Sequence, residues 1–250
     1  MPPIWREARF GLELTSLLRD PLFGGASPAD RAHPVMLLSG YMAGDDSLKM
    51  MAAWLRRTGH RPHRGGIRWN VGCSARMLES LEIRLEDVAK REGPVAIVGQ
   101  SRGGLFARVL AVRRPDLVSG IVTLGSAHLD PLAVHPLLRL QIHVMGLLGT
   151  LGAPGLFSAS CRWGDCCTDV GAELAGPFPE EVGFVSVYSR SDGIIDWRSC
   201  LDPAARCVEI ESSHCGMSAH PAAYREVAAA LSEFGASPSD EATVIQAQAI

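Results

Sequence analysis

Val95 to Gly104 reads Val-Ala-Ile-Val-Gly-Gln-Ser-Arg-Gly-Gly, and it is the most informative segment of the 250-residue chain. A compact run of β-branched and small apolar residues stops at the pattern Gly-x-Ser-x-Gly, and an amphipathic segment from Leu105 to Arg113 follows directly. A short apolar run predicts a buried strand, and the apolar spacing after it predicts a helix. We therefore expect this stretch to fold as a strand, a sharp turn and a helix.

The serine of this turn, Ser101, is a candidate nucleophile. A Gly-x-Ser-x-Gly turn between a strand and a helix presents the serine hydroxyl at its tip, where a base and a substrate carbonyl can both reach it. Gly99 and Gly103 fit such a turn because a Cβ at either position would crowd the neighbouring strand or helix. The alternative is a glycine-rich turn that binds a phosphate at the helix N-terminus or only connects two elements.

The composition favours a globular domain that acts on small molecules. Hydrophobic residues make up 47% of the chain and the formal net charge is −3, which gives no electrostatic reason to expect a nucleic acid as partner. The first residues lack a long apolar segment with a cleavage site, so we expect no signal peptide and a cytoplasmic location. The most apolar region, 132–156, is interrupted by polar residues and glycines, so we expect no membrane span.

Short apolar runs alternate with amphipathic segments along most of the chain. This alternation predicts βαβ units and a mostly parallel, doubly wound sheet with helices on both faces. We expect a single domain over 1–250, with an N-terminal helix and loop at 1–33 and a flexible tail at 236–250. The expected strands cover 34–38, 59–67, 95–99, 121–125, 182–188 and 207–210, and the expected helices cover 2–20, 48–58, 75–91, 105–113 and 220–234.

The alternation of strand and helix patterns stops between 126 and 179. In this segment apolar helical runs are separated by glycines and prolines, and no strand is expected. A segment of this length without strands is usually a lid or a substrate-binding cap. Its apolar faces would be costly in water unless they covered an apolar ligand. The alternative is a set of ordinary packing helices.

Candidate partners for Ser101 follow it in the chain. A serine nucleophile needs a base to take its proton and a carboxylate to orient that base. Among eight histidines, His214 alone lies in the loop after the last expected strand. Asp192 lies just past the preceding strand, with Asp196 and Asp202 as rivals for the role of the acid. In addition, two backbone N–H groups must stabilise the developing oxyanion, and we expect them from Tyr41 and Arg102.

Seven cysteines leave the redox state open. Neither a Cys-x-x-Cys pair nor a His-x-x-x-His pair is present, so we expect no metal site. Without a signal peptide, reduced thiols are expected; one disulfide, within 161–167 or between Cys200 and Cys207, is the alternative if the protein is exported. The cysteines considered for a metal or a disulfide are Cys161, Cys166, Cys167, Cys200, Cys207 and Cys215.

Three segments together give the chain a resemblance to the α/β-hydrolase superfamily, on the side of the bacterial lipases and esterases, over about 34–234. They are Leu-Leu-Ser-Gly-Tyr at 37–41, Gly-Gln-Ser-Arg-Gly-Gly at 99–104, and Ser-Asp-Gly-Ile-Ile at 191–195 followed by Ser-His at 213–214. The resemblance implies the α/β-hydrolase fold with a helical lid, Ser101 as nucleophile, Asp192 as acid and His214 as base. One departure is Ser39, which stands where such lipases often have a histidine before the glycine.

The resemblance also implies hydrolysis of a carboxylic ester through an acyl-enzyme intermediate and without a cofactor. The expected partner is a small-molecule ester, with an apolar acyl chain lying under the 126–179 segment. An acyltransferase or a lactonase would use the same three residues, and a non-catalytic ligand-binding domain is the alternative from a different class.

Overall fold

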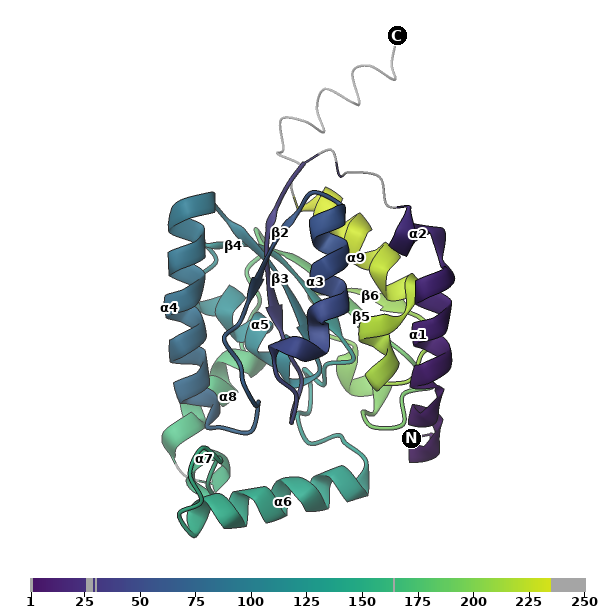
Figure 1. Ribbon diagram of the computed structural model, residues 1–250. Coiled ribbons are helices and arrows are strands. Elements are labelled where there is room, and N and C mark those ends of the chain that lie inside the picture. Colours follow the sequence, from purple (N-terminus) through teal and green to yellow (C-terminus); the bar gives the residue numbers. More distant parts are fainter. Residues whose placement is uncertain (1, 26–28, 30, 164, 235–250) are drawn as a thin grey trace.

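The chain folds around one six-stranded parallel sheet, seen in a computed structural model that describes residues 2–25, 29, 31–163 and 165–234 (Figure 1). The strand order is β2-β1-β3-β4-β5-β6, and each neighbouring pair is parallel. The strands are β1 (Pro34–Leu38), β2 (Arg61–Arg64), β3 (Val95–Gln100), β4 (Val118–Leu124), β5 (Gly183–Tyr188) and β6 (Arg206–Glu209).

Helices cover both faces of the sheet (Figure 1). Successive side chains of a strand point to opposite faces, so Val35 and Leu37 of β1 join one core while Met36 and Leu38 join the other. The first core is closed by α1 (Phe10–Arg19), α3 (Lys49–Arg57) and α9 (Pro221–Glu233), and the second by α4 (Ser74–Glu92), α5 (Arg102–Arg113) and α8 (Thr168–Ala175). The prediction of a doubly wound α/β sheet is confirmed.

Several predicted elements differ from those in the structure. The basic segment 59–67 contributes only the short edge strand β2, and the predicted helix at 2–20 is divided into a 3₁₀ helix, Ile4–Arg9, and α1. A further short helix, α2 (Pro21–Gly24), begins in the predicted loop, where Asp20 caps it by accepting a hydrogen bond from the Leu22 backbone N–H. The tail expected at 236–250 lies outside the described residues.

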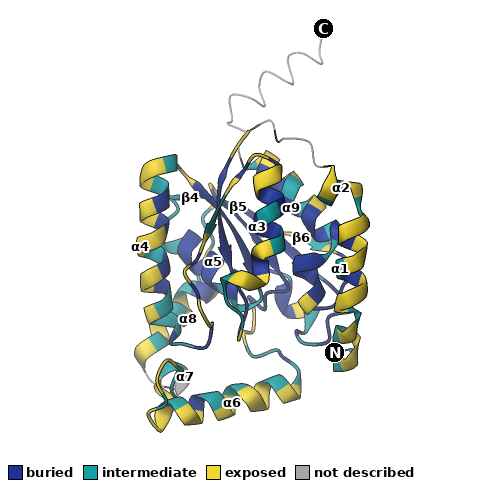
Figure 2. Cartoon of the chain, in the orientation of Figure 1, coloured by how far each residue is buried: buried dark blue, intermediate teal, exposed yellow. Residues whose placement is uncertain are grey.

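The 126–179 segment lies across the carboxyl ends of the strands (Figure 1). Its helices are α6 (Pro136–Thr150), α7 (Ser160–Trp163), a 3₁₀ helix (Asp165–Cys167) and α8. Much of α6 is exposed (Figure 2), including Leu137, Leu140, Val144, Leu147 and Leu148. The segment is thus positioned over the edge of the sheet where Ser101 lies, and its role as a lid stays a prediction.

None of the helices in the described part of the chain combines the length and the apolar composition needed to cross a bilayer.

Candidate active site

Ser101 occupies the turn between β3 and α5 with φ 52° and ψ −121°. Only one other described non-glycine residue, Met42, has a positive φ, so this backbone conformation is a local exception. The crowding expected around the turn is present: a Cβ on Gly99 would collide with the backbone of Gly103, and a Cβ on Gly103 would collide with that of Leu38. The turn is therefore built so that the Ser101 side chain projects from the carboxyl edge of the sheet.

His214 and Asp192 form a buried pair at this edge. The His214 Nδ1 atom lies 2.7 Å from Asp192 Oδ2, and both side chains are almost fully buried. The other carboxylate oxygen, Oδ1, accepts hydrogen bonds from the backbone N–H groups of Ile194 (2.8 Å) and Ile195 (2.7 Å). With both carboxylate oxygens engaged, Asp192 holds the imidazole with Nδ1–H as the donor, which leaves Nε2 free to accept a proton.

The rival carboxylates are used elsewhere. Asp196 accepts a hydrogen bond from the backbone N–H of Arg198 and caps the 3₁₀ helix Trp197–Cys200. Asp202 is buried in an ion pair with Arg108, at 2.7 Å between Nε and Oδ2. Asp192 is therefore the one of the three candidates that contacts His214.

The environment of His214 favours its protonated form. Burial lowers its pKa, but the negative charge and hydrogen bond of Asp192 outweigh burial, and the carboxylate of Glu7 adds to them. The net result is a pKa raised above the usual histidine value of 6.5. This is the direction that helps a base retain a proton taken from a serine hydroxyl.

Ser101 and His214 both lie beside the carboxyl end of β4, next to Leu124 and to the following residue, Gly125. The Ser101 N–H donates to the carbonyl oxygen of Leu124 at 2.8 Å, and a Cβ on Gly125 would lie 3.0 Å from His214 Nδ1. From the other direction, the Gln100 side chain donates to the His214 carbonyl oxygen at 3.2 Å. Within the described residues, Ser101 Oγ makes no hydrogen bond to the imidazole; such bonds are often loose in ligand-free enzymes and tighten with substrate.

The backbone groups expected to stabilise an oxyanion lie next to Ser101. A Cβ on Gly40 would lie 3.1 Å from Ser101 Cβ, so the loop after β1 passes directly against the serine. Tyr41 follows this glycine, and Arg102 is the first residue of α5, where an N–H has no acceptor within the helix. The Arg102 amide is thus next to the serine in the chain, and the Tyr41 amide belongs to the loop that passes against the serine.

The Arg102 side chain has a role that the sequence did not indicate. Its guanidinium reaches the start of α4 and the loop before it, where it donates to the carbonyl oxygens of Asn70 (3.1 Å) and Gly72 (2.7 Å) and to Ser74 Oγ (2.9 Å). Asn70 in turn donates to the Ser39 carbonyl oxygen at 2.8 Å. Arg102 therefore connects the nucleophile turn to the loop after β1 through 70–74.

Two glutamates of the N-terminal segment hold the acid and base loops. Glu7 accepts hydrogen bonds from the backbone N–H groups of Gly193 (2.9 Å), His214 (3.1 Å) and Cys215 (2.9 Å). Glu13 is buried and accepts from the N–H of Ser213 at 2.7 Å and from its hydroxyl. We call Glu7 and Glu13 the carboxylate anchor.

The carboxylate anchor was not expected from the sequence, whose pattern predicts only a helix at 2–20. The one local signal was Glu13, which lies four residues before the buried Leu17 and therefore on the same face of α1. A charged residue on a buried helix face needs a polar partner, and that partner lies about 200 residues further along the chain.

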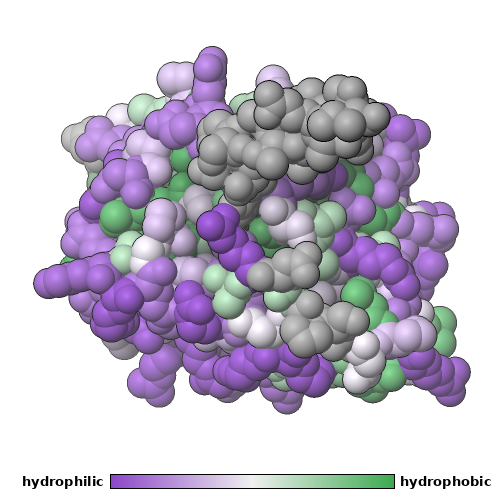
Figure 3. Space-filling model, turned by 90° about the horizontal axis from the view of Figure 1, so that it is seen from above, coloured by the Kyte–Doolittle hydropathy of each residue, from purple (hydrophilic) through white to green (hydrophobic). Residues whose placement is uncertain are grey.

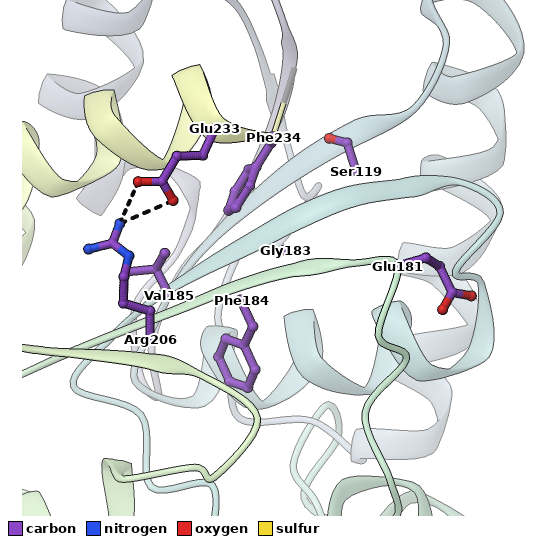
Figure 4. A pocket seen from close by; sticks show the side chains of 8 residues that line it. All are labelled: Ser119, Glu181, Gly183, Phe184, Val185, Arg206, Glu233 and Phe234. Atoms are coloured by element: carbon purple, nitrogen blue, oxygen red, sulfur yellow. Dashed lines mark hydrogen bonds and ion pairs between the residues drawn. The ribbon is translucent and has the colours of Figure 1, made fainter. Parts of the chain in front are cut away.

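A cavity of about 280 Å³ opens at the other end of the sheet (Figure 4). Its lining includes Ser119 and Gly183, near the amino ends of β4 and β5, and the ion pair between Arg206 and Glu233. The visible surface at this end is mostly hydrophilic (Figure 3). Because ligands of parallel α/β sheets bind beyond the carboxyl ends of the strands, this cavity is not part of the candidate active site.

Comparisons with known proteins identify the fold. No protein-family model matches the chain, and no curated protein does. Solved structures do: a mature lipase from Bacillus licheniformis matches with a TM-score of 0.57 and 13% identity, covering 77% of this chain and 89% of the lipase. A carboxylesterase from Bacillus subtilis matches with a TM-score of 0.51 and 14% identity, covering 89% of this chain and 97% of the esterase.

The mouse alpha/beta hydrolase domain-containing protein 10 is similar over 80% of this chain and 88% of its own, with a TM-score of 0.52 and 17% identity. Together with the parallel sheet and its strand order, these likenesses show that the chain has the α/β-hydrolase fold.

Proposed function

We propose that the protein is a serine hydrolase that cleaves carboxylic esters, with Ser101 as nucleophile, His214 as general base and Asp192 as the acid that orients it. The observation that carries this proposal is the 2.7 Å contact between His214 and Asp192, buried at the edge of the sheet from which the Ser101 turn projects. A phosphate-binding turn would require neither of these two residues. The esterases and lipases among the structural neighbours support the same class of chemistry.

In the proposed reaction, His214 Nε2 takes the proton of the Ser101 hydroxyl while Oγ attacks the ester carbonyl. The negative charge that develops on the carbonyl oxygen is stabilised by the backbone N–H groups of Tyr41 and Arg102. The protonated His214 then gives its proton to the departing alcohol, which leaves an acyl group on Ser101. Water, activated by His214, releases the acid and restores the serine.

We further propose that the ester carries an apolar acyl chain. Helix α6, which carries the exposed leucines, crosses the carboxyl ends of the strands (Figure 1), and the Tyr41 ring contacts Phe157 of the 126–179 segment at 6.5 Å between ring centroids. Gln141 of α6 also contacts the Met42 sulfur at 2.9 Å. An acyl chain between this segment and the loop after β1 would remove apolar surface from water.

Labelling with a fluorophosphonate probe tests the nucleophile. We expect mass spectrometry to find the label on Ser101 of the folded protein, and Ser101→Ala to lose both the label and the hydrolysis of p-nitrophenyl esters. Ser119→Ala is the matched control, because its hydroxyl has no hydrogen-bond partner among the described residues and lies at the opposite end of the sheet. A label on another residue, or hydrolysis that survives in Ser101→Ala, would overturn the assignment.

The acyl preference has a separate test. Rates measured on a series from acetate to octanoate esters should rise with chain length. A steady fall along this series would contradict the proposed apolar acyl site and leave the nucleophile assignment untouched.

A further inference from the structure

Four cysteine side chains converge beside the loop that Arg102 holds. The Sγ atoms of Cys73, Cys161, Cys166 and Cys167 all lie within 4.8 Å of one another. Cys73 belongs to the loop before α4, whereas the other three belong to the 126–179 segment. We call these four residues the cysteine cluster. The remaining three cysteines of the chain, Cys200, Cys207 and Cys215, have no part in it.

The spacing of the four sulfur atoms matches a tetrahedral metal centre. A zinc–sulfur bond of about 2.3 Å implies a distance of about 3.8 Å between any two sulfurs of the tetrahedron. The sulfur of Cys73 lies 3.7 Å from that of Cys167, and the sulfur of Cys166 lies 3.9 Å from that of Cys161 and 4.0 Å from that of Cys167. The closest pair, Cys73 and Cys166, is at 3.2 Å.

The surroundings of the cysteine cluster suit thiolates. The Arg102 guanidinium binds Gly72 and Ser74, the two neighbours of Cys73. A divalent ion held by four thiolates has a net negative charge, which this cation would offset.

We propose that the cysteine cluster binds one zinc ion through the four thiolates of Cys73, Cys161, Cys166 and Cys167. Each thiol gives its proton to solvent when it binds the metal, and no bond is oxidised or reduced. Because Cys166 is exposed, the ion can enter from solvent. Four protein ligands leave no open position for water or substrate, so the site is structural.

The expectation of no metal site depended on the missing Cys-x-x-Cys spacing. That expectation considered the cysteines after 160, whereas Cys73 lies far ahead of them in the chain and is added only by folding. The metal would join the 126–179 segment to the loop that Arg102 connects with the nucleophile turn. Its presence does not depend on the proposed ester hydrolysis, and its test does not use that activity.

The first measurement is the metal content of the full chain, purified with a thiol reductant and without chelator. We expect one zinc per chain after gel filtration, measured by plasma mass spectrometry. Cys73→Ser and Cys166→Ser should each retain only a small fraction of it. Cys207→Ser is the matched control, because this exposed cysteine lies outside the cysteine cluster, and it should bind zinc as the wild type does.

Cobalt gives an independent readout of the ligands. After the bound metal is removed and Co²⁺ is added, a tetrahedral thiolate site should show intense visible bands and a sulfur-to-cobalt charge-transfer band in the near ultraviolet. The visible bands and the charge-transfer band should appear in wild type and Cys207→Ser and disappear in Cys166→Ser. Because Cys166 is exposed, its replacement should not unfold the protein, so the loss of the bands would report the loss of a metal ligand. A metal-free wild type, zinc unchanged in both cluster variants, or disulfides among the four cysteines in the freshly purified chain would each overturn the proposal.

Discussion

Two regions of the molecule hold the loops around Ser101, and they use different chemistry. On one side, the carboxylate anchor binds backbone amides of the acid and base loops with charge-assisted hydrogen bonds. On the other side, the 126–179 segment meets the loop before α4 through the cysteine cluster and through a hydrogen bond of 2.8 Å from the Phe157 N–H to the Val71 carbonyl oxygen. These two attachments lie on opposite sides of the strand ends (Figure 1).

The two attachments differ in whether they need a bound ion. The carboxylate anchor consists of groups that the chain always carries, so we expect the acid and base to be held whenever the protein is folded. The cysteine cluster holds its segment only when the thiols are reduced and the proposed metal is bound. The proposed catalytic residues and the segment that would cover the substrate can therefore be disturbed separately.

The largest effect should come from breaking the acid–base pair itself. Asp192→Asn keeps the shape of the side chain but no longer enforces the correct tautomer of His214, so kcat/KM should fall by about 10⁴-fold. Asp196→Asn is the matched control, since this aspartate caps a 3₁₀ helix without contacting His214. If Asp196→Asn abolished ester hydrolysis while Asp192→Asn retained it, the assignment of the acid would be wrong.

The next largest effect should come from the buried half of the carboxylate anchor. Glu13→Ala leaves the N–H and the hydroxyl of Ser213 without their acceptor, so the free energy of unfolding in urea should fall by about 3 kcal/mol. Glu211→Ala, which removes an exposed carboxylate paired with Arg9, should leave it almost unchanged. Equal losses in the two variants would show that Glu13 does not support the base loop.

Metal removal should have a smaller effect, confined to the 126–179 segment. After chelation, hydrolysis of octanoate esters should fall relative to hydrolysis of acetate esters, by about tenfold or less. The reason is that the 126–179 segment would lose its attachment to the loop before α4, while Ser101, Asp192 and His214 stay in place. The measurement is the octanoate-to-acetate ratio of kcat/KM with and without zinc. Complete loss of acetate hydrolysis would contradict the separation of the two regions.

The smallest effect should be a shift in pH dependence. The Glu7 carboxylate raises the pKa of His214, and the base works only when it is neutral. Glu7→Gln removes this negative charge and lowers the His214 pKa, so the acid limb of the kcat/KM profile should move to lower pH. Glu211→Gln serves as the control, and a shift to higher pH in Glu7→Gln would contradict the electrostatic role of Glu7.

Features that depend on neighbours in the chain could be predicted from the sequence. The strand, turn and helix around Ser101 follow from the apolar spacing and from two glycines, at which a Cβ would push the strand and the helix apart. The alternation of apolar runs and amphipathic segments predicts the parallel sheet. The order of Ser101, Asp192 and His214 along the chain also indicated which loops would meet, because carboxyl ends of parallel strands share one edge.

Which side chains meet across that edge became known from the folded chain. Asp192, Asp196 and Asp202 lie close together in sequence, and local patterns do not specify which of them contacts His214. The bond from Glu13 to Ser213 and the approach of Cys73 to the later cysteines join segments that no periodicity relates. These contacts depend on how distant segments pack on the sheet, which is why the carboxylate anchor and the cysteine cluster became visible only in the folded chain.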